Sequence, residues 1–135
     1  MSNTDIFLRY NSVWETFDID AILEFFAEDG IFDMVNVRKA TGHAEIRAVV
    51  EAIITPHDTG RFEILNIAEN SAGKVMNERV DRFLRKDGKW ISIGVMGVFE
   101  FVDGKIAAQR DYFDVQTFRN QMADYDQGGQ PSKDK

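Results

Sequence analysis

Apolar residues in the first half of the chain recur at the spacing of three and four residues that is typical of amphipathic helices. The pattern predicts three helices. The first follows possible N-caps at residues 2–5, the second is stopped by Asp29-Gly30, and the third begins at Thr41-Gly42 and ends before Pro56. Their apolar positions are Ile6, Tyr10, Val13, Trp14 and Phe17, then Ile22, Leu23, Phe25 and Phe26, and finally Ile46, Val49, Val50 and Ile53.

The second half changes to the alternating pattern of strands. A short strand at residues 31–35 comes before the third helix and leads into a basic loop, and four longer strands are predicted at residues 62–69, 74–85, 90–101 and 105–114. A last short helix is predicted at residues 115–122. Helices followed by consecutive strands indicate an α+β fold, here a curved, mostly antiparallel sheet. We expect the three N-terminal-half helices to cover one face and to form a cone around an apolar pocket.

Charged residues stand inside two of these strands. One strand contains Asn77-Glu78-Arg79-Val80-Asp81, and Arg110-Asp111-Tyr112-Phe113-Asp114 follows two strands later. Residues two apart on a strand point to the same face of a sheet. Arg79 and Asp81 are therefore predicted to share a face.

The turns between the strands place Asp111 on that face as well. Both turns carry an Asp-Gly-Lys segment, and three-residue loops would pair Arg79 with Val95 and Val95 with Asp111. Two-residue loops would put Met96 between Arg79 and Asp111 instead. With either loop length, Arg79 and Asp111 lie in one row across three strands. The two residues are then two strand spacings apart, roughly 10 Å in total. Two acids organised by one arginine are a candidate active site.

The rest of this face is apolar. Phe83 and Phe113 each follow one of the two acids by two residues, and Ile93 and Val95 lie on the strand between them. Small-molecule sites are usually apolar pockets with a few convergent polar groups, so we expect these four residues to bind a small apolar substrate. A structural ion pair inside a core would give the same pattern, and the residue types alone favour neither reading.

Composition excludes several classes of site. The net charge of −7 argues against nucleic acid or an anionic membrane as a partner. The absence of cysteine removes disulfides and thiolate chemistry. His43 and His57, at a helix start and in a loop, are expected to be solvated, and no cluster has metal-ligand spacing, so no metal is expected. The start of the chain does not have the pattern of a signal peptide and no stretch could span a bilayer, so a cytoplasmic location is expected.

The strand motifs resemble the limonene-1,2-epoxide hydrolase family, within the nuclear-transport-factor-2-like (SnoaL-like) superfamily, whose cone fold is cystatin-like. The resemblance is carried by residues 26–29, Gly42, 77–81, 97–99, 104–106 and 110–114. It implies that Arg79, Asp81 and Asp111 are the catalytic triad of an epoxide hydrolase that uses no cofactor. Asp111 would activate a water, Asp81 would protonate the epoxide oxygen in the same step, and Arg79 would hold both acids.

The sequence departs from the family on the first strand. An ungapped match from Asp29 to Gly42 puts Phe32 and Met34 where the family has a Tyr and an Asn that hold the water. Asn36 lies two residues further on the same face and is expected to substitute in part. We expect all three side chains to contact the substrate, and simple terpene-like epoxides to be hydrolysed weakly or not at all.

Two other functions fit the same pocket. One is an isomerase or cyclase of the ketosteroid isomerase or SnoaL kind, and the other is a non-catalytic domain that binds a small molecule. In all three cases residues 1–126 are expected to form a single domain, with a disordered tail at 127–135. Pairing into a homodimer is expected through the outer sheet face, which carries Met76, Val80, Leu84, Val98 and Tyr112.

Overall fold

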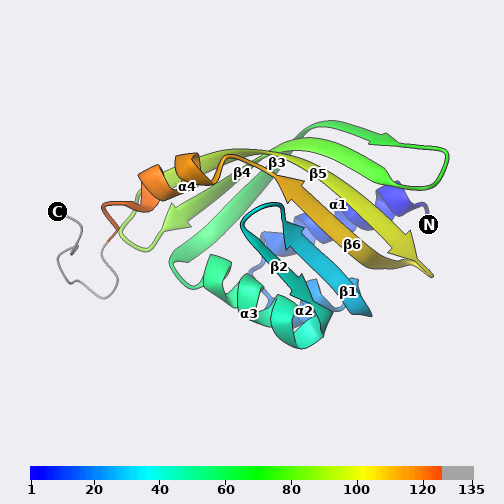
Figure 1. The fold of residues 1–135 in the computed structure, drawn as a ribbon. Coiled ribbons are helices and arrows are strands. Elements are labelled where there is room, and N and C mark those ends of the chain that lie inside the picture. The colour runs from blue at the N-terminus through cyan, green and yellow to red at the C-terminus, as the bar shows by residue number, and fades with distance from the viewer. Residues whose placement is uncertain (126–135) are drawn as a thin grey trace.

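The computed structural model describes residues 1–125 (Figure 1). In this range the helices are α1 (Asn3–Trp14), α2 (Ile19–Leu23), α3 (Gly42–Ile54) and α4 (Val115–Met122), and the strands are β1 (Phe26–Met34), β2 (Arg38–Thr41), β3 (His57–Glu69), β4 (Val75–Arg85), β5 (Trp90–Val102) and β6 (Lys105–Tyr112). The strands form one sheet in the order β2-β1-β6-β5-β4-β3, and only the β1–β6 pair is parallel. The predicted α+β fold with a curved, mostly antiparallel sheet is confirmed. The predicted tail lies outside the described residues.

The segment predicted as the end of the second helix is a strand instead. α2 ends at Leu23 and β1 begins at Phe26. The register between β1 and β6 shifts inside β1, and a Cβ atom on Gly30 would lie 3.0 Å from the carbonyl oxygen of Ile106. The pair Asp29-Gly30 therefore marks a β-bulge with a close backbone approach, not a helix stop. The basic loop that follows also contains β2, which sequence reasoning missed.

The core lies between the sheet and the first three helices. α3 packs against β1 and β2, and α1 packs against β3 and β4. Figure 1 shows α1 running behind the long strands and α3 beside the β1–β2 pair. Phe7, Tyr10 and Trp14 project from α1 into this core, and the ring of Tyr10 packs edge-on against Phe99 of β5. α1 therefore forms a wall of the space that the inner face of the sheet encloses.

Polar contacts fix α1 on the edge strand β3. Asn11 donates a hydrogen bond from Nδ2 to the carbonyl oxygen of Phe62 (3.0 Å), and Glu15 accepts one from the Phe62 amide (3.1 Å). The helix begins with a capping box, in which the Ser2 and Asp5 side chains each bond the other's backbone amide. Both ends of α1 are thus held, which keeps its aromatic side chains in place.

α4 is fixed by Arg85, a charged residue whose side chain is buried. The Arg85 guanidinium donates to the carbonyl oxygen of Gln121 (2.8 Å) and pairs with Asp87 and with Asp124, which follows α4. Gln121 also exchanges two hydrogen bonds of 2.8 Å with the backbone of Ser92. α4 has no fully buried residue, so these polar contacts determine where it sits on the sheet.

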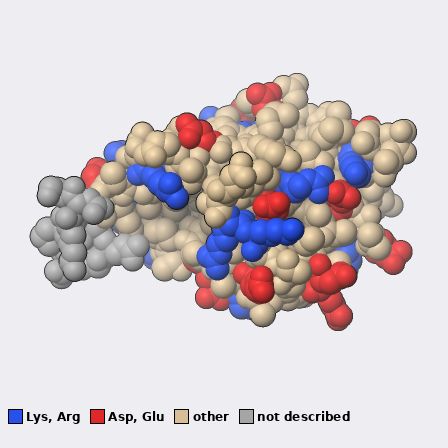
Figure 2. All heavy atoms as spheres, viewed as in Figure 1, with Lys and Arg blue, Asp and Glu red and all other residues tan. Residues whose placement is uncertain are grey.

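The visible surface carries both acidic and basic side chains (Figure 2). No helix in residues 1–125 is long and apolar enough to cross a membrane.

Candidate active site

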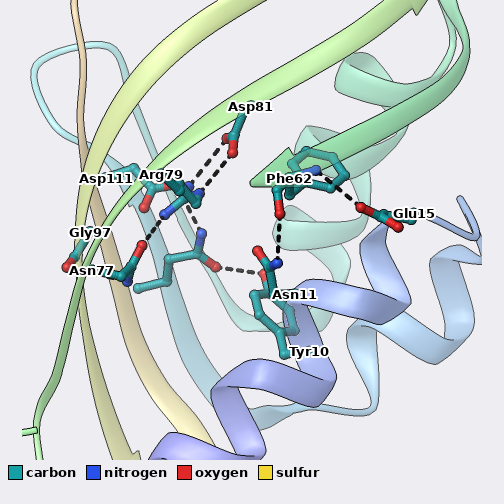
Figure 3. Close-up of polar contacts among 10 residues, drawn as sticks. Tyr10, Asn11, Glu15, Phe62, Asn77, Arg79, Asp81, Gly97 and Asp111 are labelled. Carbon is teal, nitrogen blue, oxygen red and sulfur yellow. Dashed lines mark hydrogen bonds and ion pairs between the residues drawn. The ribbon is translucent and has the colours of Figure 1, made fainter. Parts of the chain in front are cut away.

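Arg79 and Asp81 on β4 meet Asp111 on β6 inside the molecule (Figure 3). Arg79 donates to Asp81 through Nε (2.9 Å) and Nη2 (3.3 Å), and its Nη2 also donates to Oδ2 of Asp111 (2.8 Å). The side chains of Arg79 and Asp111 are 6% and 7% exposed, and that of Asp81 is 14% exposed. The predicted contact of one arginine with both acids is confirmed, and Asp81 is the more exposed of the two acids.

The register that brings these residues together differs in one hairpin from the expectation. Arg79 pairs with Val95, as three-residue loops predict, but Asp111 pairs with Gly97, because the β5–β6 turn has two residues and the register shifts by one more residue between Glu100 and Phe101. A shift of two residues keeps Asp111 on the same face, so the predicted cluster forms nonetheless. The shift also places Gly97, and not Val95, opposite Asp111 on β5.

Gly97 is needed for this contact. A Cβ atom at this position would lie 2.8 Å from Nη1 of Arg79 and 2.9 Å from Oδ1 of Asp111. Such distances are too short for non-bonded heavy atoms, so any side chain would push the ion pair apart. Gly97 belongs to one of the motifs that carry the family resemblance, and its structural role depends on tertiary contacts with two other strands.

A second layer of buried polar groups holds the cluster. Nη1 of Arg79 donates to Oδ1 of Asn77 (2.9 Å), and Nε2 of Gln109 donates to Oδ2 of Asp111 (2.9 Å). The Gln109 oxygen in turn accepts a hydrogen bond from the Tyr10 hydroxyl (2.6 Å). A continuous chain of hydrogen bonds therefore runs from α1 through β6 to β4.

Sequence reasoning missed Gln109 and Tyr10 as parts of the site. Gln109 could have been found, because it stands two residues before Asp111 and so shares its face of β6. Tyr10 was assigned only to the core face of its helix. Its contact with Gln109 joins residues 99 positions apart, and no local pattern in the sequence signals it.

Burial and charge act in opposite directions on the ionisable groups. Burial raises the pKa of Asp81, the neighbouring Arg79 lowers it, Asp111 raises it again, and the net shift is upward. Burial alone would lower the pKa of Arg79, but the two carboxylates outweigh it and keep the guanidinium charged. Burial also raises the pKa of Tyr10, which keeps its hydroxyl a donor. Two acids thus share one cation, which favours retention of a proton in the cluster.

The cluster lies at the end of a cavity of about 330 Å³ whose walls are largely apolar. All of the predicted substrate-contacting residues except Asn36 line it, namely Phe32, Met34, Phe83, Ile93, Val95 and Phe113. Asn36 lies in the β1–β2 turn with a φ of 64° and is not among the lining residues, so it does not replace the missing polar groups of β1. β1 therefore gives the cavity an apolar wall next to Asp111.

The histidines are not placed for metal binding. His57, which was expected to be solvated, is 3% exposed and bonds the carbonyl oxygen of Ile53 through Nδ1 (2.7 Å), and burial lowers its pKa. His43 bonds the carbonyl oxygen of Phe26 through Nε2 (2.9 Å). Within residues 1–125 no three His, Asp or Glu side chains are grouped as metal ligands.

Residues 3–124 match the limonene-1,2-epoxide hydrolase catalytic domain. The chain belongs to the limonene-1,2-epoxide hydrolase family. This match spans every helix and strand described above. The family resemblance seen in the strand motifs is therefore confirmed, and the buried acid cluster belongs to a chain of this family.

Solved structures with the same fold have diverse functions. An epoxide hydrolase from Mycobacterium tuberculosis that is described as similar to limonene-1,2-epoxide hydrolase is 22% identical to this chain. Its TM-score is 0.74, and the match covers 87% of this chain and 86% of the other. The epoxide hydrolase/cyclase-like enzyme SalBIII, described in pyran ring formation in the polyether salinomycin, is 21% identical, with a TM-score of 0.76 over 85% and 92%. A putative polyketide cyclase from Xanthomonas campestris is 21% identical, with a TM-score of 0.75 over 88% and 95%. At these identities the likeness shows the fold alone.

Proposed function

We propose that this member of the limonene-1,2-epoxide hydrolase family adds water to a small apolar epoxide in one step, with Asp81 as general acid and Asp111 as general base. The observation that carries the proposal is the asymmetry of the two acids around Arg79. Burial raises the pKa of Asp81, and this acid is the more exposed of the two. A protonated carboxyl group that faces the cavity is suited to donating a proton to an epoxide oxygen.

Asp111 has the environment of an anion. Its Oδ2 receives N–H donors from both Arg79 and Gln109, and such donors complement a carboxylate. Its Oδ1 is buried and receives no hydrogen bond from residues 1–125. Oδ1 is therefore the oxygen that is free to accept the proton of a nucleophile.

Asp81 and Asp111 account for both proton transfers of the reaction. A water gives one proton to Asp111 while its oxygen forms a bond to one epoxide carbon, the bond between that same carbon and the epoxide oxygen breaks, and Asp81 delivers its proton to the departing oxygen. The product is a vicinal diol. Asp81 is left ionised and Asp111 protonated, so one proton must return to Asp81 before the next turnover.

The test is incubation of the protein with a panel of apolar epoxides in ¹⁸O-labelled water. One labelled oxygen in the diol, without transient label in the protein, supports direct attack by water. Asp81→Asn and Asp111→Asn should each remove the activity while the fold is retained. A rearranged product without label would instead indicate an isomerase, and a thermal shift without turnover would indicate a binding domain.

The apolar β1 wall favours a second candidate, a cyclase. Phe32 and Met34 cannot hold a water, but a hydroxyl group carried by the substrate is positioned by the substrate itself. Asp111 and Asp81 would then activate that hydroxyl and protonate the epoxide as before. A hydroxy-epoxide converted to an unlabelled cyclic ether in ¹⁸O-labelled water would support this candidate over the hydrolase.

A further inference from the structure

Two arginines that are not part of the triad also line the cavity. Arg38 is the first residue of β2, next to the β1–β2 turn, and Arg119 lies on α4. Both are exposed to solvent as well as lining the cavity. In Figure 2, basic side chains are visible over α4 and over the β1–β2 turn, on the same face of the molecule.

Neither arginine has a partner in the described part of the chain. Within residues 1–125, no hydrogen bond or ion pair is formed by the guanidinium of Arg38 or of Arg119. By contrast, Arg47, Arg82 and Arg110 each pair with a surface carboxylate. The chain has 23 acidic and 16 basic residues, so carboxylates for pairing are plentiful. Two guanidinium groups without a partner in residues 1–125 therefore lie beside one cavity.

The two arginines sit on elements that are held in place. α4 is bound to the sheet through the contacts of Arg85 and Ser92 with Gln121. Arg38 pairs with Met34 in the β1–β2 ladder, and Met34 pairs with Asp111 of the triad. The backbone positions of both arginines thus have a fixed relation to the acid cluster, and their side chains extend into solvent.

The cavity consequently has three chemically distinct parts. The buried end holds two acids and one arginine, the walls are apolar, and the exposed rim carries Arg38 and Arg119. An anion is disfavoured beside the anionic Asp111 at the buried end and is favoured beside the two arginines at the rim. A ligand that matches all three parts has a neutral reactive end, an apolar body and an anionic end.

We propose that the substrate is an apolar epoxide whose remote end carries a carboxylate, bound at the rim by Arg38 and Arg119. This inference rests on the proposed function for the nature of the reactive end. Guanidinium groups bind carboxylates through paired N–H donors, which gives orientation as well as attraction. A cavity of about 330 Å³ holds roughly ten atoms of the size of a water molecule, at about 30 Å³ each. That volume suits a substrate with a hydrocarbon chain of medium length.

The arginine stems could line the cavity without any role for the charge, because long basic side chains often cover apolar surface while their heads stay in water. The test must therefore separate charge from packing. Arg→Gln removes the charge and keeps part of the stem, and Arg→Lys keeps the charge. Arg61, an exposed arginine of β3 without an ion pair in residues 1–125 and away from the cavity, provides the matched control.

Binding is measured first with a ligand that cannot react. Titration calorimetry should show that decanoate binds about tenfold more tightly than the corresponding alcohol, and that added salt weakens only decanoate. Arg38→Gln and Arg119→Gln should each weaken decanoate binding about threefold, and the double variant about tenfold. Arg→Lys should restore most of the loss, and Arg61→Gln should change nothing. Equal binding of acid and alcohol, or a double variant that binds decanoate normally, would overturn the inference.

Turnover is measured next with terminally epoxidised decanoic acid and its methyl ester. The acid should have the lower KM with a similar kcat, and the Arg38→Gln/Arg119→Gln variant should lose this preference. If both substrates react with the same KM, the proposed function stands and the inference fails. If decanoate binds as expected but neither epoxide reacts, the rim site stands and the proposed function fails.

Discussion

Gly97 lies directly opposite Asp111 on the neighbouring strand, and the space above its Cα atom is where Asp111 and Arg79 meet. β5 thus lies between the two strands that carry the triad, and opposite Asp111 it has a position without a side chain. The triad depends on this position as much as on its charged members.

Gly97→Ala should therefore abolish most activity while the protein still folds. The added methyl group would approach Arg79 and Asp111 to less than 3.0 Å and shift both. A displacement of this kind costs about a hundredfold in rate, and overpacking costs about 1–3 kcal/mol in the free energy of unfolding. Gly94→Ala on the same strand is the control, because its Cβ atom would meet nothing within 4 Å. Equal activity of the two variants would show that Gly97 has no such role.

Gln109→Leu should lower both stability and kcat. The substitution leaves the Tyr10 hydroxyl and one lone pair of Asp111 without their partner, and an unsatisfied buried polar group costs about 1–3 kcal/mol. Urea unfolding and steady-state kinetics measure the two effects. Tyr10→Phe breaks the same chain from the other end, so the double variant should lose less than the sum of the single losses. Strict additivity would mean that Tyr10 and Gln109 act independently.

The raised pKa of Asp81 predicts a specific dependence of stability on pH. Between the ordinary value of 3.8 and its raised value in the folded protein, the folded state binds more protons at Asp81 than the unfolded state does. The contribution of Asp81 to stability is therefore fully present below 3.8 and is lost as pH rises through the folded-state pKa. Asp81→Asn should remove this part of the dependence in urea unfolding at a series of pH values. A variant with the wild-type pH profile would contradict the prediction.

Restoring polarity on β1 should increase hydrolysis. Met34 pairs with Asp111 and Phe32 pairs with Gln109 across the β1–β6 ladder, so Phe32→Tyr with Met34→Asn puts a hydroxyl and an amide beside the base. An added orienting donor is worth about a hundredfold or more in rate, and burying the new groups costs about 1–3 kcal/mol of stability. The measurement is diol formation from limonene oxide. A folded double variant with no gain, or full activity in the wild type, would show that the water is held elsewhere.

The outer sheet face predicts a homodimer. Met96 and Tyr112 pair across β5 and β6, and both are about half exposed, as is Trp90 on the same strand as Met96. Apolar side chains gathered on one face are better covered than solvated. Light scattering at micromolar concentration should give twice the mass of one chain, and Met96→Lys with Tyr112→Lys should halve it. A wild-type monomer under these conditions would refute the prediction.

The parts of this protein that follow from local pattern were predictable, and those that depend on contacts distant in sequence were not. Alternation and two turn motifs were enough to put Arg79, Asp81 and Asp111 on one face, and the two-residue register error at Gly97 did not change that face. The bulge at Gly30 could not be foreseen, because the close approach that requires it involves a strand 76 residues away in the chain (Ile106). His57 was wrongly expected to be solvated for a similar reason, since polar residues are buried only where tertiary partners receive them.

The parallel pairing of β1 with β6 has a consequence for how the protein folds. β4, β5 and β6 are joined by tight hairpins, so the strands that carry the acid cluster can associate through contacts close in sequence. β1 reaches β6 only by closing a loop of about 80 residues, from Phe26 to Ile106. We expect the acid cluster to assemble early and the apolar wall beside it to be added late, so that in pulsed hydrogen exchange β5 becomes protected before β1.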